Sequence, residues 1–413
     1  MDKDTKTSAY SQLFQPFFNE KITEQFEKLE VDKYVKKLTT IQLIQLIAYA
    51  QIQQEKCLRE ISNNFLDPDF QMSIGLESIS FSQISRRLRD LDPEAVKFVF
   101  KCVIRELTIL VGADKVTKEL GRLHLIDSST ISLCLARYPW AVFRKTKSGV
   151  KLHLRLKFWD GNVIPDQAVI SNAKVADKRK MDELVVEDAD AMNVYDRGYV
   201  DYKKFDRYCE NGIRFTTRLK ENAIVEIIEE YPINPNSPVL KDQRVYLGNN
   251  QTKMEHPLRL IEVLDTQGER VVIITNDFGL KVEAIGDIYR YRWQIELFFK
   301  WIKQHFSIKH FYGLSQPAVQ NQLYIALCSY CLLMLIKLET DFTKTLLELS
   351  RILKVSLYEP FTAFVKKLRR WRPKSRGRRR LNNGTIYQMT EWQVLETLEA
   401  EHLNDVTYDP IIL

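Results

Sequence analysis

Three acidic residues stand at positions where a protein can do metal-dependent chemistry. Asp127 follows the apolar residues 123–126, Asp196 follows the strand-like residues 192–195, and Glu296 lies in a helical stretch. The ends of strands in an α/β sheet converge on a crevice, so the first two acids are expected to meet there. Carboxylates from separate elements suit Mg²⁺, which takes its remaining ligands from water and phosphate. Two such ions about 3.5–4 Å apart would activate a water or a 3′-hydroxyl and stabilise the leaving oxygen.

The stretch around Glu296 carries a second pattern. Counted from Tyr289, the residues Arg292, Glu296 and Lys303 follow at steps of three, four and seven. At about 100° per residue, all four side chains share one face of a helix. A carboxylate flanked by Tyr, Arg and Lys suits a phosphodiester, because the acid holds a metal while the others hold phosphate oxygens. The alternative is an ordinary amphipathic helix in which Arg292 and Glu296 form an i,i+4 ion pair.

Three short motifs together resemble a known family. The helix reads Tyr-x2-Arg-x3-Glu-x6-Lys from Tyr289 to Lys303, the second acid begins Asp196-Arg197-Gly198-Tyr199, and the first begins Asp127-Ser128-Ser129-Thr130. In this order they resemble the DDE transposases of bacterial insertion sequences, in the branch (the IS-four family) marked by that Y-R-E-K signature. The resemblance covers about residues 123–338, preceded by a helical region of the kind often found in these transposases.

The resemblance implies a fold, a reaction and a set of partners. The fold is an α/β, ribonuclease-H-like catalytic domain with a β-rich insertion between the second Asp and the Glu, for which 99 residues are available. Asp127, Asp196 and Glu296 become the catalytic metal ligands, with two Mg²⁺ per site and Mn²⁺ as a substitute. Tyr289, Arg292 and Lys303 position the DNA strand. The reaction is hydrolysis at the terminal inverted repeats of the element, followed by attack of the freed 3′ ends on double-stranded target DNA, carried out by a homodimer on DNA.

The coarse pattern of the chain predicts three parts. Residues 1–120 read as a helical, DNA-binding N-terminal domain, and Thr40 is a candidate cap for one of its helices. Residues 121–340 alternate between strands and helices, as in a mixed sheet, with a β-rich insertion at about 212–280 and a helix expected at 182–190. Residues 341–413 form a helical C-terminal region with a basic segment at 366–380.

The positive charge is concentrated near the C-terminus. The net charge is +7, but residues 361–380 hold ten Lys or Arg and no Asp or Glu, so the remaining chain carries −3. Such a density attracts phosphates independently of base sequence, and Arg369, Arg370 and Arg372 are candidate DNA contacts. The alternative is a solubilising tail.

Two further basic features are candidate DNA contacts. Arg86, Arg87 and Arg89 follow the polar residue Ser80 on a predicted helix, which suits the recognition helix of a helix-turn-helix or, equally, a solvated helix face. Lys151 lies on an alternating strand, where it faces either DNA or solvent.

Composition excludes other classes of protein. Hydrophobic residues make up 45% of the chain, which is too many for a disordered protein. The longest apolar run, residues 323–336, is shorter than the about 20 residues of a membrane span and indicates a buried core helix. The polar N-terminus and six scattered cysteines indicate a cytoplasmic chain with no membrane partner. The alternatives to a transposase are a nuclease of the same fold that only cuts, and a DNA-binding protein that has lost catalysis.

Overall fold

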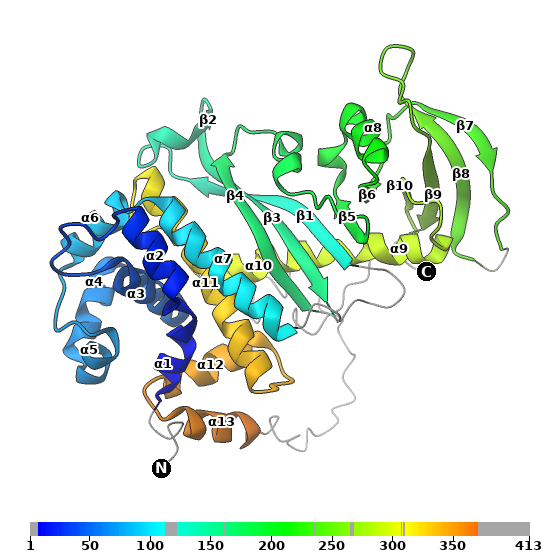
Figure 1. Ribbon diagram of the computed structural model, residues 1–413. Helices are drawn as coiled ribbons and strands as arrows, with labels where there is room; N and C mark the ends of the chain where they lie inside the picture. Colours follow the sequence, from blue (N-terminus) through cyan, green and yellow to red (C-terminus); the bar gives the residue numbers. More distant parts are fainter. Residues whose placement is uncertain are drawn as a thin grey trace, which may run out of the picture.

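The N-terminal part is helical, as the sequence predicts. The computed structural model describes residues 7–111, 122–159, 162–234, 237–264, 268–306, 308 and 310–370. The first of these stretches forms α1 (Ala9–Phe14), α2 (Glu20–Lys28), α3 (Thr40–Gln53), α4 (Leu58–Asn63), α5 (Pro68–Ile74), α6 (Phe81–Asp90) and α7 (Pro93–Val111). The helices gather into one body beside the sheet (Figure 1).

Polar caps decide where two of these helices begin. Ser80 caps α6, accepting the backbone N–H of Gln83, whose side chain in turn accepts the Ser80 N–H. The same capping box starts α3, but its cap is Thr39 and not Thr40. Thr40 is instead buried, and its hydroxyl donates to Asp32 at 2.8 Å. The prediction of Thr40 as the cap is therefore wrong by one position, and the Thr40 hydroxyl bonds the tertiary partner Asp32 instead.

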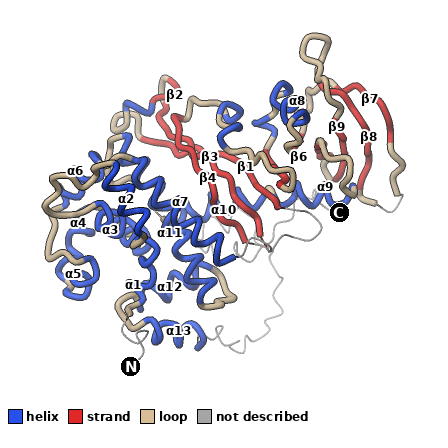
Figure 2. Tube along the Cα trace, in the orientation of Figure 1, coloured by secondary structure: helices blue, strands red, loops and turns tan. Residues whose placement is uncertain are grey.

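The middle part of the described chain is built on one ten-stranded sheet. Its order is β2-β3-β1-β5-β6-β10-β9-β8-β7, with β4 pairing with β3 (Figure 1). Figure 2 shows these strands in red and the helices in blue. Only β1, β5 and β6 pair in parallel, and the remaining pairs are antiparallel. The strands are β1 (Arg122–Leu133), β2 (Val142–Arg144), β3 (Lys147–Trp159), β4 (Asn162–Asn172), β5 (Ala191–Tyr195), β6 (Arg214–Arg218), β7 (Val225–Glu230), β8 (Val239–Leu247), β9 (Leu258–Leu264) and β10 (Arg270–Thr275).

The predicted β-rich insertion continues the main sheet. β6 lies beside β5, and β10, β9, β8 and β7 then extend the sheet outward as antiparallel pairs.

The prediction of a helix at residues 182–190 is wrong, because the structure has only a 3-10 turn at Met181–Glu183 there. Asn193 explains the irregular backbone, since its side-chain amide accepts from the Val186 N–H at 2.9 Å and donates to the Val186 carbonyl at 3.0 Å. These bonds replace the backbone bonds of a helix.

Helices cover both faces of the sheet. α8 (Tyr202–Glu210) packs on one face, where Phe205 and Tyr208 join Ile126 and Tyr195 in a separate apolar cluster. The opposite face is covered by α9 (Val282–Tyr291), α10 (Trp293–His305) and α11 (Gln316–Glu339). Because successive residues of a strand point to opposite faces, the residues that follow Ile126 and Tyr195 must face α9 and α10.

The apolar run at residues 323–336 is a core helix, as predicted. It lies in α11, which is long and apolar enough to cross a membrane but is buried over nearly its whole length among α3, α6, α7 and α12 (Leu346–Ser356). α13 (Phe361–Arg370) then returns to the N-terminal helices, where the Phe361 N–H donates to the Thr7 carbonyl. The first and last described helices therefore share one hydrophobic core.

Candidate active site

The two aspartates lie side by side on neighbouring parallel strands. β1 and β5 pair so that Ile126 is opposite Tyr195; Asp127 is the next residue on β1, and Asp196 is the first residue beyond the end of β5, where the backbone is still extended. Ile126 and Tyr195 point toward α8, so both acids point toward α9 and α10. The expected meeting of the two acids follows from this register.

The position of Asp127 differs from the prediction in one respect. Asp127 does not end its strand, because β1 continues to Leu133. Its antiparallel partner β3 runs on beside it, pairing Asp127 with Leu154 and Leu133 with Ser148. Only the parallel partner β5 stops, at Tyr195. The crevice is therefore made by the end of β5 against the middle of β1.

Glu296 comes from α10, which crosses the β1 side of the sheet. The predicted single helix is interrupted at Arg292, which separates α9 from α10 while keeping right-handed helical angles. Because the interruption is small, Arg292, Glu296 and Lys303 still share one face of the helix. Arg292 contacts Asp127 and Glu296, and Lys303 contacts Ser129 on β1. Tyr289 is buried beside them, with the Arg292 guanidinium 5.5 Å from the centre of its ring.

Arg292 joins two of the acids. Its Nη1 lies 2.7 Å from Oε1 of Glu296 and 3.6 Å from Oδ2 of Asp127. The first contact is the i,i+4 pair that the sequence offered as an alternative reading, and the second crosses from helix to sheet. The Arg292–Glu296 ion pair within the helix is therefore also part of the cluster of acids.

Burial and mutual repulsion characterise this cluster. Burial raises the pKa of Asp127 to about 7, opposed by Arg292 and the Ser128 N–H and reinforced by Asp196 and Glu296. For Arg292, burial acts to lower the pKa, but the groups Tyr289, Glu296, Asp127 and Asp196 prevail and raise it. Burial raises the pKa of Tyr289 to about 12. The site therefore holds more negative charge than one guanidinium balances, which favours binding of a further cation.

Lys303 reaches the segment that follows the first aspartate. Its Nζ donates to Oγ of Ser129 at 2.6 Å and to the Thr130 carbonyl at 3.3 Å. The lysine therefore lies along β1, two and three residues beyond Asp127. An ammonium in this position would meet a phosphate group of a strand laid across the acids.

The donor chemistry of the site fits a divalent metal ion. Three carboxylates supply hard oxygen ligands from β1, the end of β5 and α10, as Mg²⁺ or Mn²⁺ prefers. In the part of the chain that the structure describes, no three His, Cys, Asp or Glu side chains already lie close enough to hold one ion together. Arg292 instead supplies the positive charge at Asp127 and Glu296. Metal binding at these acids therefore requires Arg292 to give up part of its contacts.

A fourth carboxylate, missed by sequence reasoning, supports the first aspartate from behind. Oδ1 of Asp177 accepts the Ser128 hydroxyl at 2.6 Å and the Lys151 ammonium at 3.0 Å. Its Oδ2 faces Gly198, where an added Cβ would lie 3.6 Å away. Ser128 in turn donates its backbone N–H to Asp127 at 2.7 Å. Asp177 thus supports the segment after Asp127, and no local pattern marks it, because its partners lie far away in sequence.

Several predicted DNA contacts lie outside this cluster. Lys151 is on the α8 side of the sheet, where its Nζ also donates to the Val175 carbonyl at 3.1 Å. Arg86 and Arg89 are exposed on α6, whereas Arg87 turns inward and donates to the Val31 and Leu38 carbonyls.

The predicted basic contacts near the C-terminus are only partly described. Arg369 and Arg370 are exposed at the end of α13. Arg372 and the remainder of the basic segment lie outside the described residues.

Comparison with known proteins agrees with the geometry. The family described as "Transposase DDE domain" matches residues 119–332, and a "Domain of unknown function (DUF4372)" matches residues 5–76. The chain is 27% identical to the "Probable transposase for insertion sequence element IS5377" of Geobacillus stearothermophilus, covering 72% of this chain and 82% of that protein. It is 30% identical to the "Putative transposase y4zB" of Sinorhizobium fredii, covering 60% of this chain and 70% of that protein.

Among solved structures, the piggyBac transposase synaptic complex with hairpin DNA is similar over 99% of this chain and 92% of that chain. The sequence identity is 13% and the TM-score is 0.45. The match over residues 119–332 covers more than half of the chain and includes the cluster of Asp127, Asp196 and Glu296. The protein therefore belongs to the DDE transposases of bacterial insertion sequences, and its function is DNA transposition.

Proposed function

We propose that this transposase cuts the ends of its element and joins the freed 3′ ends to target DNA at the cluster of Asp127, Asp196 and Glu296. The observation that carries the proposal is the convergence of Asp127 and Glu296 on one guanidinium, with Asp196 on the adjacent strand. Acids so arranged would hold Mg²⁺, or Mn²⁺ in its place, and two ions would polarise the scissile phosphate.

The positive groups around the acids have a separate role in the proposal. Arg292 would move from the carboxylates to phosphate oxygens as the metal enters, since guanidinium binds both groups well. Lys303 would hold the strand along β1, where it now bonds Ser129 and the Thr130 carbonyl. Tyr289 packs against Arg292 and would fix the direction of its side chain.

We infer a ribonuclease-H-like core for the strands β4-β3-β1-β5-β6. The antiparallel strands β4, β3 and β1 are followed by parallel β5 and β6, which supports this assignment. The complete Y-R-E-K spacing from Tyr289 to Lys303 supports the IS-four branch. The proposed substrates are double-stranded terminal inverted repeats and target DNA, bound by a homodimer in the bacterial cytoplasm at the nucleoid. Arg86, Arg89, Arg369 and Arg370 remain proposed contacts to the DNA backbone.

The proposal is tested by nicking of a supercoiled plasmid that carries the DNA flanking the gene. Wild-type protein is incubated with Mg²⁺, with Mn²⁺ or with EDTA, and Asp127→Ala protein is run in parallel. Metal-dependent cuts at discrete flanking positions, absent in the variant, are the expected result. Equal behaviour of wild type and variant, with both still binding the flanks, would contradict it and favour a protein that binds without catalysis.

A second reaction distinguishes a transposase from a nuclease that only cuts. A labelled, pre-cleaved end is mixed with a target plasmid and Mg²⁺, so that strand joining is measured without the first cut. Joined product is expected in the wild type and none in Asp127→Ala. Cleavage without any joined product would restrict the proposal to the first step.

A further inference from the structure

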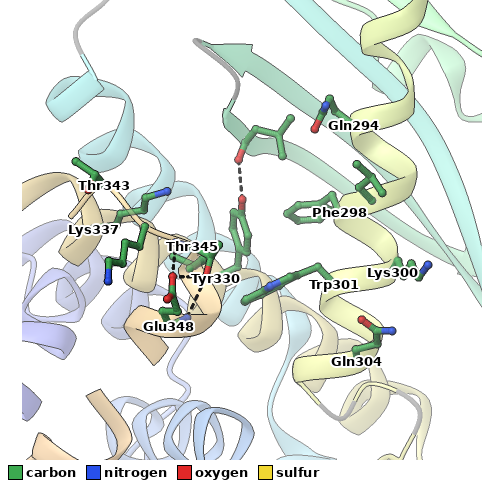
Figure 3. Close-up of a pocket in the computed structure, with 14 residues that line it drawn as sticks. Gln294, Phe298, Lys300, Trp301, Gln304, Tyr330, Lys337, Thr343, Thr345 and Glu348 are labelled. Atoms are coloured by element: carbon green, nitrogen blue, oxygen red, sulfur yellow. Dashed lines mark hydrogen bonds between the residues drawn. The ribbon is translucent and has the colours of Figure 1, made fainter. Parts of the chain in front are cut away.

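A cavity lies behind the helix that carries Glu296. It occupies about 570 Å³ between α10, the second half of α11 and the start of α12, which is within the range of ligand sites. We call it the lysine pocket; its polar lining includes Lys300, Lys337, Lys344, Thr343, Gln304 and Glu348. Figure 3 shows Trp301 and Phe298 pointing from α10 toward Tyr330 in the middle of the cavity, with Lys337 and Thr343 on the opposite wall.

The pocket has an excess of positive charge. Three lysines line it against one acid, Glu348. The carboxylate of Glu348 is committed to capping α12, where its Oε2 accepts the Thr345 N–H at 3.1 Å and the Thr345 hydroxyl at 3.0 Å. Glu348 therefore already has two hydrogen-bond partners at the start of α12.

Lys337 is held in a setting that favours an anion. It is half-buried at the end of α11, and burial lowers its pKa. Within the described residues, none of the acids forms an ion pair with it. A half-buried ammonium without a counter-ion is costly, and a bound phosphate would supply the missing charge.

The aromatic wall is held in place from behind. The hydroxyl of Tyr330 donates to the Val163 carbonyl at 2.9 Å, and the ring of Trp301 meets the Tyr330 ring edge-on at a centroid distance of 5.3 Å. Tyr330 is buried, whereas Trp301 is partly exposed. A rigid, partly exposed indole beside lysines is typical of surfaces that bind nucleic-acid strands, because bases stack on the ring while cations hold phosphates.

The pocket adjoins the proposed cutting site through one helix. Lys300 follows Glu296 by four residues on α10, which is about one helical turn, or about 6 Å along the axis. A strand that leaves the acids along α10 therefore meets Lys300 one turn further on, and Lys337 and Lys344 line the opposite side of the same cavity. Charge complementarity and this short distance favour DNA over a small anion as the occupant.

We propose that the lysine pocket binds the sugar-phosphate backbone of one DNA strand next to the point of cleavage, with Lys337 and Lys344 contacting its phosphates. The inference rests on the proposed function, because it takes the strand cut at Glu296 as its ligand. It adds a second contact region, built from α11 and α12, that lies outside the Y-R-E-K face.

The test is the affinity for DNA as a function of salt concentration. Full-length wild type is compared with Lys337→Gln/Lys344→Gln on a labelled duplex from the gene's flanking DNA. Loss of two phosphate contacts should weaken binding roughly tenfold at moderate salt and reduce the slope of log affinity against log salt by about 2. Lys337→Arg/Lys344→Arg should keep both properties, and equal circular dichroism and unfolding midpoints exclude a folding defect as the cause.

A matched control removes two charges elsewhere. Lys241→Gln/Lys253→Gln, at exposed positions on and shortly after β8 and outside the pocket, should leave the affinity and the slope unchanged. If the pocket variant also matches wild type while wild type cuts its flanking DNA, the inference is overturned and the proposed function stands. If wild type neither binds nor cuts that DNA, the proposed function fails, and this inference fails with it.

Amine labelling supplies a second readout that needs no variant. Lys337 and Lys344 are modified by an acylating reagent and quantified by mass spectrometry, in free protein, with the duplex, and with inorganic phosphate at equal phosphate concentration. Protection of both lysines by DNA alone is expected. Equal protection by inorganic phosphate would overturn the assignment to a DNA strand and indicate a small-anion site.

Discussion

The guanidinium of Arg292 lies 3.6 Å from the carboxylate of Asp127, across the boundary between α10 and the sheet. The same nitrogen is 2.7 Å from Glu296. One cation therefore stands where the proposed metal ions would bind, and it holds the acids together in the absence of metal. This relationship connects the stability of the site with its chemistry, because the group that neutralises the acids must also release them.

The role of Glu296 is tested by a substitution that keeps its shape. Glu296→Gln removes the negative charge but can still bond Arg292, so folding and DNA binding should persist. Strand cleavage should fall by about 100-fold or more, since changing a group that only orients a metal ligand already costs about 10-fold to 100-fold. Cleavage of a labelled end is the measurement. Glu283→Gln, an exposed residue on α9, is the control and should cut normally, whereas retained cleavage in Glu296→Gln would exclude Glu296 as a ligand.

Arg292 should compete with metal for the acids. Without metal, Arg292→Ala leaves Asp127 and Glu296 without their shared cation, and we expect a loss of roughly 3 kcal/mol in the free energy of unfolding. Mg²⁺ should then recover more stability in the variant than in wild type, because ligand binding adds to the stability of the folded state. Unfolding midpoints in EDTA and in Mg²⁺ give the comparison. Arg290→Ala is the control, since Arg290 pairs with Asp287 on its own helix. Identical Mg²⁺ increments in all three proteins would refute the competition.

Asp177 should act on cleavage through Ser128. Asp177→Asn weakens the bonds to the Ser128 hydroxyl and the Lys151 ammonium, so the segment beside Asp127 loses its support. We expect cleavage about 10-fold to 100-fold slower, as for other groups that orient metal ligands, with DNA affinity unchanged. A higher Mg²⁺ concentration should restore part of the rate, which a simple loss of stability would not do. Asp201→Asn, which removes the partner of Lys178 nearby, should cut at the wild-type rate.

Stability should fall in mild acid because of buried histidines. Burial lowers the pKa of His124 to about 4, although Asp166 acts to raise it, while an unfolded histidine titrates near 6.5. Between these values the unfolded chain binds the extra proton, so the stability present above pH 6.5 is lost as the pH falls toward 4. Between pH 7 and pH 5, His124 alone should cost roughly 1–2 kcal/mol.

Urea unfolding at the two pH values checks this expectation. The decrease in the free energy of unfolding from pH 7 to pH 5 should be smaller in His124→Gln than in wild type, by roughly 1–2 kcal/mol. Burial also lowers the pKa of His305 to about 4, so this residue should contribute in the same direction. The double variant His124→Gln/His305→Gln should therefore show the smallest pH dependence. Parallel pH profiles for wild type and His124→Gln would contradict the assignment.

The residues of the site could be predicted from local sequence patterns. Asp127 and Asp196 each follow a short run of mostly apolar residues, and the spacing from Tyr289 to Lys303 requires one helix face wherever that helix lies. The buried nature of α11 also followed from its run of apolar residues. These features depend on neighbours within a few residues, which is the range over which periodicity and capping act.

Only the tertiary structure decided how these residues act together. The parallel register that places Ile126 opposite Tyr195 brings the two aspartates side by side, although 68 residues separate them. The contact between Arg292 and Asp127, the support from Asp177 and the inward turn of Arg87 depend equally on distant partners. No local pattern encodes such contacts, because they arise only when burial of the apolar faces has packed the helices against the sheet. The chain alone thus determined which groups are available for the proposed metal and phosphate contacts, and the fold decided which of them meet.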